Sequence, residues 1–266
     1  MILYSHRLDE ENPGDWYASP RHYFDLGEHT TIDVDKRVEV DVDIHRLNIA
    51  GGGAIFSGTK WAKQNLDIKK DSYAQYNVVW GAGALLRKES IVIALEQYDK
   101  VGIRNYQESY PSEKIEFLPC ASCMHPVFDK EYTVTDPVGL IRHFKRELPY
   151  IPGPKKFGMK EHNKIRNKPQ TIEDIVAFIG RHETIITNSY HAAYWSMLMN
   201  KRTICYVPND TPDDKLLTFE ISPIIYDDSG FDGSLLKKDY NYKNLLQRYR
   251  ERNKVFYERV KVLYTR

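Results

Sequence analysis

The chain has 266 residues, of which 41% are apolar, and its 38 basic and 37 acidic side chains leave a formal net charge of +1. This length suits one large or two modest globular domains, and the balanced charge gives no global field that would favour nucleic acid. No apolar run approaches the roughly 18 residues of a membrane span, no secretory leader is visible, and three cysteines do not make a paired framework. We therefore expect a globular cytoplasmic protein.

Short apolar runs alternate with segments of helical periodicity along the chain. The expected strands are Met1–Tyr4, Val38–Ile44, Leu47–Ala50, Asn77–Trp80, Lys100–Ile103, Ile115–Leu118, Thr184–Thr187, Thr203–Val207 and Pro223–Tyr226. The expected helices are Trp16–Phe24, Ser57–Gln64, Ser90–Gln97, Val138–Glu147, Thr171–Gly180, Tyr190–Met199 and about Lys237–Tyr264. This alternation predicts an α/β protein with two Rossmann-like domains facing a cleft, residues 1–98 and 99–233, and a C-terminal amphipathic helix within residues 234–266.

Glycine-rich turns follow several of the early strands. Near the start, Asn12-Pro-Gly-Asp15 is a turn in which Asp15 could cap a helix or bind a sugar hydroxyl. Gly51, Gly52 and Gly53 end one strand, and Gly81 and Gly83 end the next. Glycine lets the backbone turn sharply and approach a ligand closely, although a tight turn alone would also require it. We expect these glycines to line a ligand cleft.

The second half begins with Lys100-Val-Gly-Ile-Arg104, a strand followed by an arginine. A guanidinium at the carboxyl end of a strand suits a carboxylate or phosphate, and a surface ion pair is the alternative. The Cys120-Ala-Ser-Cys123 spacing lacks a second cysteine pair, so we expect a packed loop in preference to a zinc or redox site.

The segment Thr184–Met199 carries the most chemistry. A β-branched run ends in Asn188-Ser189-Tyr190-His191-Ala192, and helical spacing follows at once. Strand, tight turn and helix place His191 at a helix N-terminus, where unpaired amides and the helix dipole favour an anion. A simple helix cap at Asn188 or Ser189, with His191 as an ordinary first-turn residue, is the alternative.

A basic stretch precedes this unit. Residues Pro154–Lys168 include five lysines and arginines that we single out: Lys155, Lys156, Lys160, Lys164 and Arg166. A solvated loop is the simpler interpretation, and a lid that meets an anionic substrate is the alternative.

These residues together resemble the polysaccharide pyruvyl transferase family. The resemblance rests on the helix capped at Thr171, the strand Thr184–Thr187, the histidine turn with His191, and Gly102-Ile-Arg104 followed by Ser109. It extends to the Asn12–Asp15 turn and to both glycine turns. Ser189 stands where many members carry an arginine, which places more of the anion binding on Arg104 and backbone amides.

The resemblance implies a two-domain fold like that of GT-B glycosyltransferases, with the acceptor on the N-terminal domain and the donor on the C-terminal one. Phosphoenolpyruvate would be the co-substrate, and a sugar diol of a surface polysaccharide or its lipid-linked precursor would be the acceptor, giving a pyruvate ketal. His191 and Arg104 would be catalytic; Asn188, Ser189, Tyr190, Ala192 and Ser122 would bind the donor; and Asn12, Asp15 and the five glycines would line the acceptor side. No step requires a metal, so we expect neither a metal nor another cofactor.

The C-terminal segment from Lys237 carries ten basic and three acidic residues among regularly spaced apolar ones. We expect it to pack across the domains, and its basic excess also suits contact with the anionic inner face of a membrane that holds a lipid-linked acceptor. Two other functions stay open at this point: a nucleotide-sugar glycosyltransferase of GT-B type, and a non-catalytic glycan-binding protein.

Overall fold

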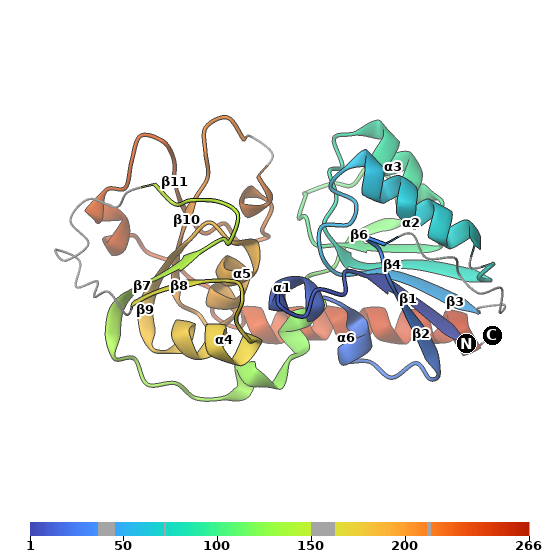
Figure 1. The fold of residues 1–266 in the computed structure, drawn as a ribbon, viewed down its shortest axis with the longest axis horizontal. Coiled ribbons are helices and arrows are strands. Elements are labelled where there is room, and N and C mark those ends of the chain that lie inside the picture. The colour runs from blue at the N-terminus through green and yellow to red at the C-terminus, as the bar shows by residue number, and fades with distance from the viewer. Residues whose placement is uncertain (37–45, 72, 150–162, 212–213, 266) are drawn as a thin grey trace. The chain divides into compact units, whose positions relative to one another are not determined.

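A computed structural model describes residues 1–36, 46–71, 73–149, 163–211 and 214–265 (Figure 1). The chain forms two compact units. Unit 1 comprises Met1–Glu10, Gly14–Met124 and Arg248–Arg266, and unit 2 comprises Glu11–Pro13 and His125–Gln247. The expected strand Val38–Ile44 and the lysines Lys155, Lys156 and Lys160 lie outside the described residues.

Unit 1 is built on a six-stranded sheet in which each strand runs parallel to its neighbours. Its strands are β1 (Ile2–His6), β2 (His29–Asp33), β3 (Leu47–Gly51), β4 (Tyr76–Ala82), β5 (Lys100–Ile103) and β6 (Ile115–Phe117), in the order β2-β1-β3-β4-β5-β6. The boundary expected at residues 98 and 99 falls inside this sheet, because β5 pairs with β4. The units divide after Met124 instead.

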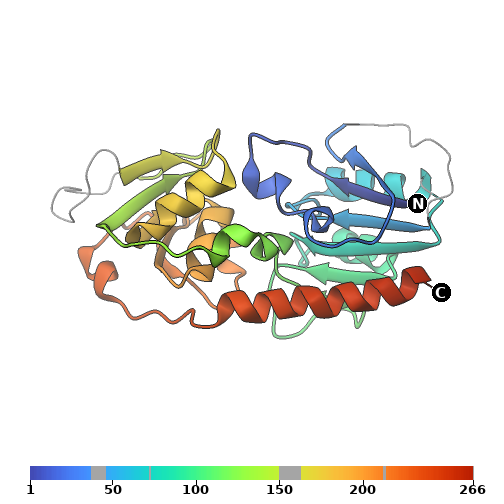
Figure 2. The same cartoon turned by 90° about the horizontal axis from the view of Figure 1, so that it is seen from below.

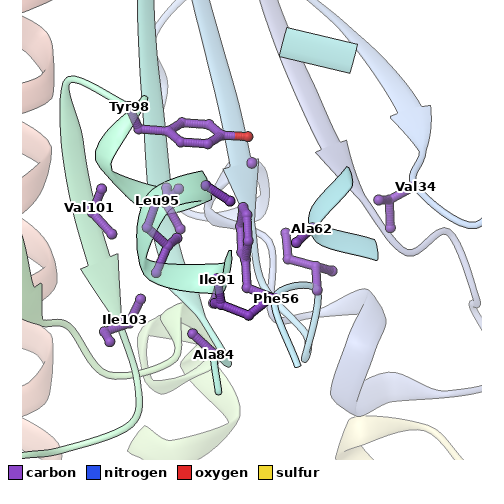
Figure 3. Close-up of a cluster of buried hydrophobic side chains, with 14 of the residues drawn as sticks. Val34, Phe56, Ala62, Ala84, Ile91, Leu95, Tyr98, Val101 and Ile103 are labelled. Carbon is purple, nitrogen blue, oxygen red and sulfur yellow. The ribbon is translucent and has the colours of Figure 1, made fainter. Parts of the chain in front are cut away.

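Helices cover both faces of this sheet, and alternate residues of each strand supply the two cores. On one face Leu3, Ala50 and Val79 pack with residues of α2 (Thr59–Asp71) and α3 (Glu89–Glu96), as Figure 3 shows for part of the cluster. The strand residues that alternate with these point to the other face and pack against α6 (Leu245–Thr265). Figure 2 shows α6 running along the strands. The parallel sheet of unit 1 is therefore buried on both sides.

Helix α6 is fixed to unit 1 by a buried asparagine. Trp80 Nε1 donates to Asn253 Oδ1 at 2.9 Å, and Asn253 Nδ2 donates to Pro119 O at 3.2 Å. The helix buries Leu245, Tyr249, Asn253, Phe256 and Val260, which recur at the three- to four-residue spacing of one helix face. It begins at Leu245, later than the expected Lys237, because Gly233–Lys237 forms a separate 3-10 turn.

Unit 2 contains a five-stranded parallel sheet. Its strands are β7 (Asp136–Arg142), β8 (Lys164–Arg166), β9 (His182–Thr187), β10 (Arg202–Tyr206) and β11 (Ile224–Tyr226), in the order β11-β10-β9-β7-β8. The helices are α4 (Ile172–Gly180) and α5 (Tyr190–Leu198). The expected cap of α4 is confirmed: Asp174 N donates to Thr171 Oγ1 at 3.1 Å, and Thr171 N donates to Asp174 Oδ2 at 3.2 Å.

Two predicted helices are wrong. The first part of the segment Val138–Glu147 lies in strand β7, which pairs with a strand on either side. A short run of buried apolar residues cannot be assigned to a helix or a strand by its periodicity alone. Gly139 also leaves no room for a side chain, since a Cβ there would lie 2.8 Å from both His182 and Phe178. The segment Trp16–Phe24 is replaced by α1 (Pro13–Trp16) and a 3-10 turn, Pro20–His22.

Among the residues that the structure describes, no helix has both the length and the apolarity that crossing a membrane would require.

Candidate functional site

The turn between β9 and α5 is locked by one hydroxyl group. Thr187, the last residue of β9, donates through Oγ1 to Ile141 O on the neighbouring strand at 2.7 Å. The same oxygen accepts from Ser189 N at 3.0 Å. The predicted sequence of strand, tight turn and helix is thus confirmed, and Ser189 leaves the strand in an extended conformation as the N-cap of α5.

Helix α5 begins at Tyr190, so its first turn holds His191. Its first internal hydrogen bond runs from Ala193 N to Ser189 O at 3.0 Å. The amides of Tyr190, His191 and Ala192 precede that bond, so they cannot be satisfied within the helix. Ser189 makes no side-chain capping bond. Three backbone donors and the positive end of the helix dipole therefore coincide at His191.

His191 lies between aromatic rings and is only 9% exposed. Its ring centroid is 5.3 Å from that of Tyr190, in an edge-on arrangement, and 5.5 Å from that of Trp195. The Tyr190 ring in turn stacks on Phe219 at 4.8 Å. The Tyr190 ring, which was expected on the donor side, thus supports the imidazole from the core.

Asn188 organises the loop that follows β7. Its Oδ1 accepts from His143 N at 2.7 Å, and its Nδ2 donates to Arg146 O and Glu147 O, both at 3.1 Å. The carboxamide is thus engaged by the chain itself. Asn188, expected to bind the donor, holds the loop at residues 143–147 beside the His191 turn.

The two predicted glycine turns lie side by side in unit 1. They follow the paired strands β3 and β4, and Gly83 N donates to Gly53 O at 2.8 Å. Gly52 and Gly53 have φ values of 77° and 64°, a region that residues with a side chain rarely adopt. A Cβ on Gly52 would also lie 2.5 Å from the carbonyl carbon of Ala18. Glycine is required here by backbone conformation and by close packing.

Arg104 belongs to the same edge of unit 1. It follows β5, is 3% exposed, and donates through its backbone N to Ala82 O at 3.0 Å. A Cβ on Gly83 would lie 3.2 Å from Arg104 Nε and 3.3 Å from Nη2. The missing side chain of Gly83 thus makes room for the guanidinium. The sequence placed Arg104 in the same domain as His191; β5 instead joins it to unit 1, with the glycine turns.

Other expected site residues fall in both units. Asp15 is in unit 1, where Arg7 Nη1 contacts its Oδ2 at 3.2 Å, and Asn12 belongs to unit 2. Gly51 faces Pro20, and Gly81 has a φ of 60° beside the carbonyl of Pro119.

Ser122 is fully buried in a 3-10 turn, Ala121–Met124, with its Oγ 3.3 Å from Cys120 Sγ. All three cysteines are reduced and buried. In the part of the chain that the structure describes, no three His, Cys, Asp or Glu side chains cluster as metal ligands would.

The sequence reasoning missed a polar cluster at the end of β1. His6, the last residue of β1, is fully buried, and its Nε2 accepts from Arg21 Nε at 3.1 Å. Burial, followed by the charge of Arg21, lowers the pKa of His6 to about 3. The guanidinium of Arg21 lies over the Trp16 ring, 4.7 Å from its centroid. The available signal was a histidine close to the end of the apolar first strand, in the kind of position that identified Arg104.

Comparisons with known proteins agree with this architecture. The family model described as polysaccharide pyruvyl transferase matches residues 12–210, about three-quarters of the chain. A search of curated proteins found no match. The structure resembles that of a functionally uncharacterised protein from Klebsiella pneumoniae subsp. pneumoniae NTUH-K2044, with a TM-score of 0.53 and 11% identity over 81% of this chain and 86% of that one. At that identity the likeness concerns the fold alone. The family match shows that the chain belongs to the polysaccharide pyruvyl transferase family and is a transferase.

Proposed function

We propose that this protein transfers the pyruvyl group of phosphoenolpyruvate to two hydroxyls of a saccharide, in a surface polysaccharide or its lipid-linked precursor, and releases phosphate. The product is a cyclic pyruvate ketal. The observation that carries the proposal is His191 at the first turn of α5, beside three backbone amides that precede the helix's first internal hydrogen bond. An acid–base group next to a cluster of donors suits an anionic substrate that must also be protonated.

The chemistry assigns His191 to proton transfer. As imidazolium it gives a proton to the methylene carbon of phosphoenolpyruvate, which becomes a methyl group and leaves the adjacent carbon electrophilic. A sugar hydroxyl attacks that carbon and loses its proton to the imidazole. The C–O bond to phosphate then breaks, with the electron pair leaving on phosphate. The second hydroxyl attacks the same carbon, closes the ring and gives its proton to the released phosphate. A histidine can serve proton transfers in both directions near neutral pH.

This proposal has one anion-binding candidate in each unit, Arg104 in unit 1 and the first turn of α5 in unit 2. Phosphoenolpyruvate carries a carboxylate and a phosphate, and a buried guanidinium can hold either group through two parallel hydrogen bonds. The N-terminus of α5 at His191 suits an anionic group as well. Asn188 is then a positioning residue, because it fixes the loop that borders the His191 turn.

Membrane contact through α6 remains part of the proposal. Val255 and Val262 are 42% and 48% exposed, and they lie seven residues apart beside the exposed Lys254 and Lys261. Basic groups around apolar side chains favour an anionic lipid surface, where a lipid-linked acceptor is presented. Cosedimentation with vesicles containing anionic lipid should decline when Lys254 and Lys261 are both replaced by Gln, and binding that does not depend on them would reject this role.

The activity is tested by phosphate release from phosphoenolpyruvate with a panel of saccharide acceptors. We expect release that depends on acceptor, and a loss of about 100-fold or more in His191→Gln. Arg259→Gln, on the exposed surface of α6, is the control and should keep full activity. Full turnover by His191→Gln would overturn the assignment. Non-additive losses in an Arg104→Gln, His191→Gln double variant would show that both residues act on one substrate.

The same preparation separates the two other functions. A nucleotide-sugar glycosyltransferase should be stabilised against heat by a nucleoside diphosphate, whereas a pyruvyl transferase should be stabilised by phosphoenolpyruvate. A glycan-binding protein should bind the acceptor without releasing phosphate.

A further inference from the structure

A pocket of about 350 Å³ lies in unit 1 on the segment that joins the 3-10 turn Pro20–His22 to β2. Its lining includes Arg21, His22, Tyr23, Asp25 and His29. The volume falls in the range of small-molecule sites, and the lining combines hydrogen-bonding groups with aromatic rings. None of these residues was singled out by the sequence motifs, and the proposed transfer reaction does not use them.

Arg21 is the cation of this pocket, and no carboxylate in the described part of the chain forms an ion pair with it. Its close contacts are His6, through Nε, and the Trp16 ring, while Glu10 attracts it only from beyond ion-pair distance. Burial lowers the pKa of the Arg21 guanidinium, and the longer-range attraction of Glu10 offsets this cost of desolvation only in part. An external anion would remove that cost.

His6 holds the guanidinium in place. Since its Nε2 accepts from Arg21, the neutral ring carries its proton on Nδ1, which is buried and has no hydrogen-bond partner. With Nε fixed by His6 and one face on Trp16, the two terminal nitrogens of Arg21 have a defined orientation. A preorganised fork of this kind matches the geometry of a carboxylate or a phosphate.

Asp25, the acidic side chain in the lining, does not compete for this fork. Its Oδ1 accepts from Gly27 N at 2.9 Å and so closes the local turn. His29 similarly places Nδ1 3.3 Å from Gly27 O. The local backbone thus engages both Asp25 and His29.

We infer that Arg21, oriented by His6 and Trp16, binds an anionic group of a saccharide ligand, either the carboxylate of an acidic sugar or the phosphate that links a glycan to its carrier. This inference rests on the proposed function for the saccharide, and it narrows the acceptor to an acidic one. Arg21 is a specificity-determining residue in this account, and His6 is a positioning residue.

Binding to the full-length protein is measured by calorimetry with two probes, inorganic phosphate and a glucuronate-containing disaccharide. We expect Arg21→Gln to weaken at least one of them by about tenfold or more, which is about 1.4 kcal/mol, and Arg21→Lys to weaken it less. Arg259→Gln is the matched control and should bind as the wild type does. The probe whose affinity depends on Arg21 identifies the source of the anion.

The positioning role is tested at His6. His6→Leu removes the acceptor and should lower the affinity, while His6→Gln keeps an acceptor and should restore much of it. A thermal melt of each variant confirms folding, and Arg21→Gln tests the site even if His6→Leu does not fold.

Equal affinities of wild type and Arg21→Gln for both probes, or no binding of either probe by the wild type, would overturn the inference. Binding that depends on Arg21 without any phosphate release from phosphoenolpyruvate would instead reject the proposed function and leave this site standing.

Discussion

Gly83 offers a direct test of whether Arg104 is placed for catalysis. A Cβ added at Gly83 would lie 3.2 Å from Ala54 Cα and from Arg104 Nε, and 3.3 Å from Arg104 Nη2. These contacts are tighter than ordinary van der Waals contact by a few tenths of an ångström. The guanidinium is the end of a flexible side chain, so we expect Arg104 to move while the backbone of Ala54 stays.

The size of the effect follows from that displacement. A misplacement of about 1 Å at a reacting centre can cost about 100-fold, so a shift of a few tenths of an ångström in an anion ligand should cost about tenfold in kcat/KM. Overpacking at a buried site typically costs about 1–3 kcal/mol of stability. Because the Arg104 side chain can move, we expect the loss of stability in Gly83→Ala to lie near the lower end of that range.

The assay is phosphate release from phosphoenolpyruvate, with urea unfolding measured on the same protein. Gly58→Ala is the matched control, because its nearest neighbour, Trp61 Cε3, would be 3.8 Å from the new Cβ. It should lose neither activity nor much stability. Wild-type kcat/KM in Gly83→Ala would refute the argument that Arg104 contacts substrate from its position over Gly83.

Three further predictions concern stability. Asn253→Leu leaves two buried groups of unit 1 without a partner and should lower the free energy of unfolding by about 2–4 kcal/mol in urea, whereas Val255→Ala on the exposed side should change it by less than about 0.5 kcal/mol. The folded pKa of His6 is about 3, below its ordinary value of 6.5; its contribution to stability is therefore present above pH 6.5 and is lost as the pH falls toward 3, at up to about 1.4 kcal/mol per pH unit. His6→Gln should flatten that part of the urea stability profile, and an unchanged profile would contradict the burial argument. Thr171→Ala removes the capping box of α4 and should cost about 1 kcal/mol, while Thr171→Ser should cost much less in the same thermal melt.

The sequence predicted the local elements where pattern and termination agreed. The strand–turn–helix around His191 and the capping box at Thr171 are both confirmed, because apolar periodicity and capping residues act within a few positions of each other. It failed at Val138–Glu147, where a buried run satisfies both helical and strand interpretations. The neighbouring strands β8 and β9 decide between the two, and they lie outside any local window.

Domain membership was the other feature that local patterns could not provide. Arg104 follows a strand whose sequence says nothing of its sheet, and only its pairing with β4 assigns it to unit 1. Likewise, nothing near Arg21 in the sequence indicates that the end of β1 supplies its hydrogen-bond acceptor.

The sequence by itself determined an α/β protein of the pyruvyl transferase family, with a histidine at a helix N-terminus and glycine turns at strand ends. These depend on residue types at short spacing, which set backbone conformation directly. The tertiary structure alone decided that Asn188 holds a loop, that Gly83 makes room for Arg104, and that His6 at the end of β1 accepts a hydrogen bond from Arg21. Those are contacts between distant segments, and the folded chain fixes them by packing and hydrogen bonding that no short stretch of sequence contains.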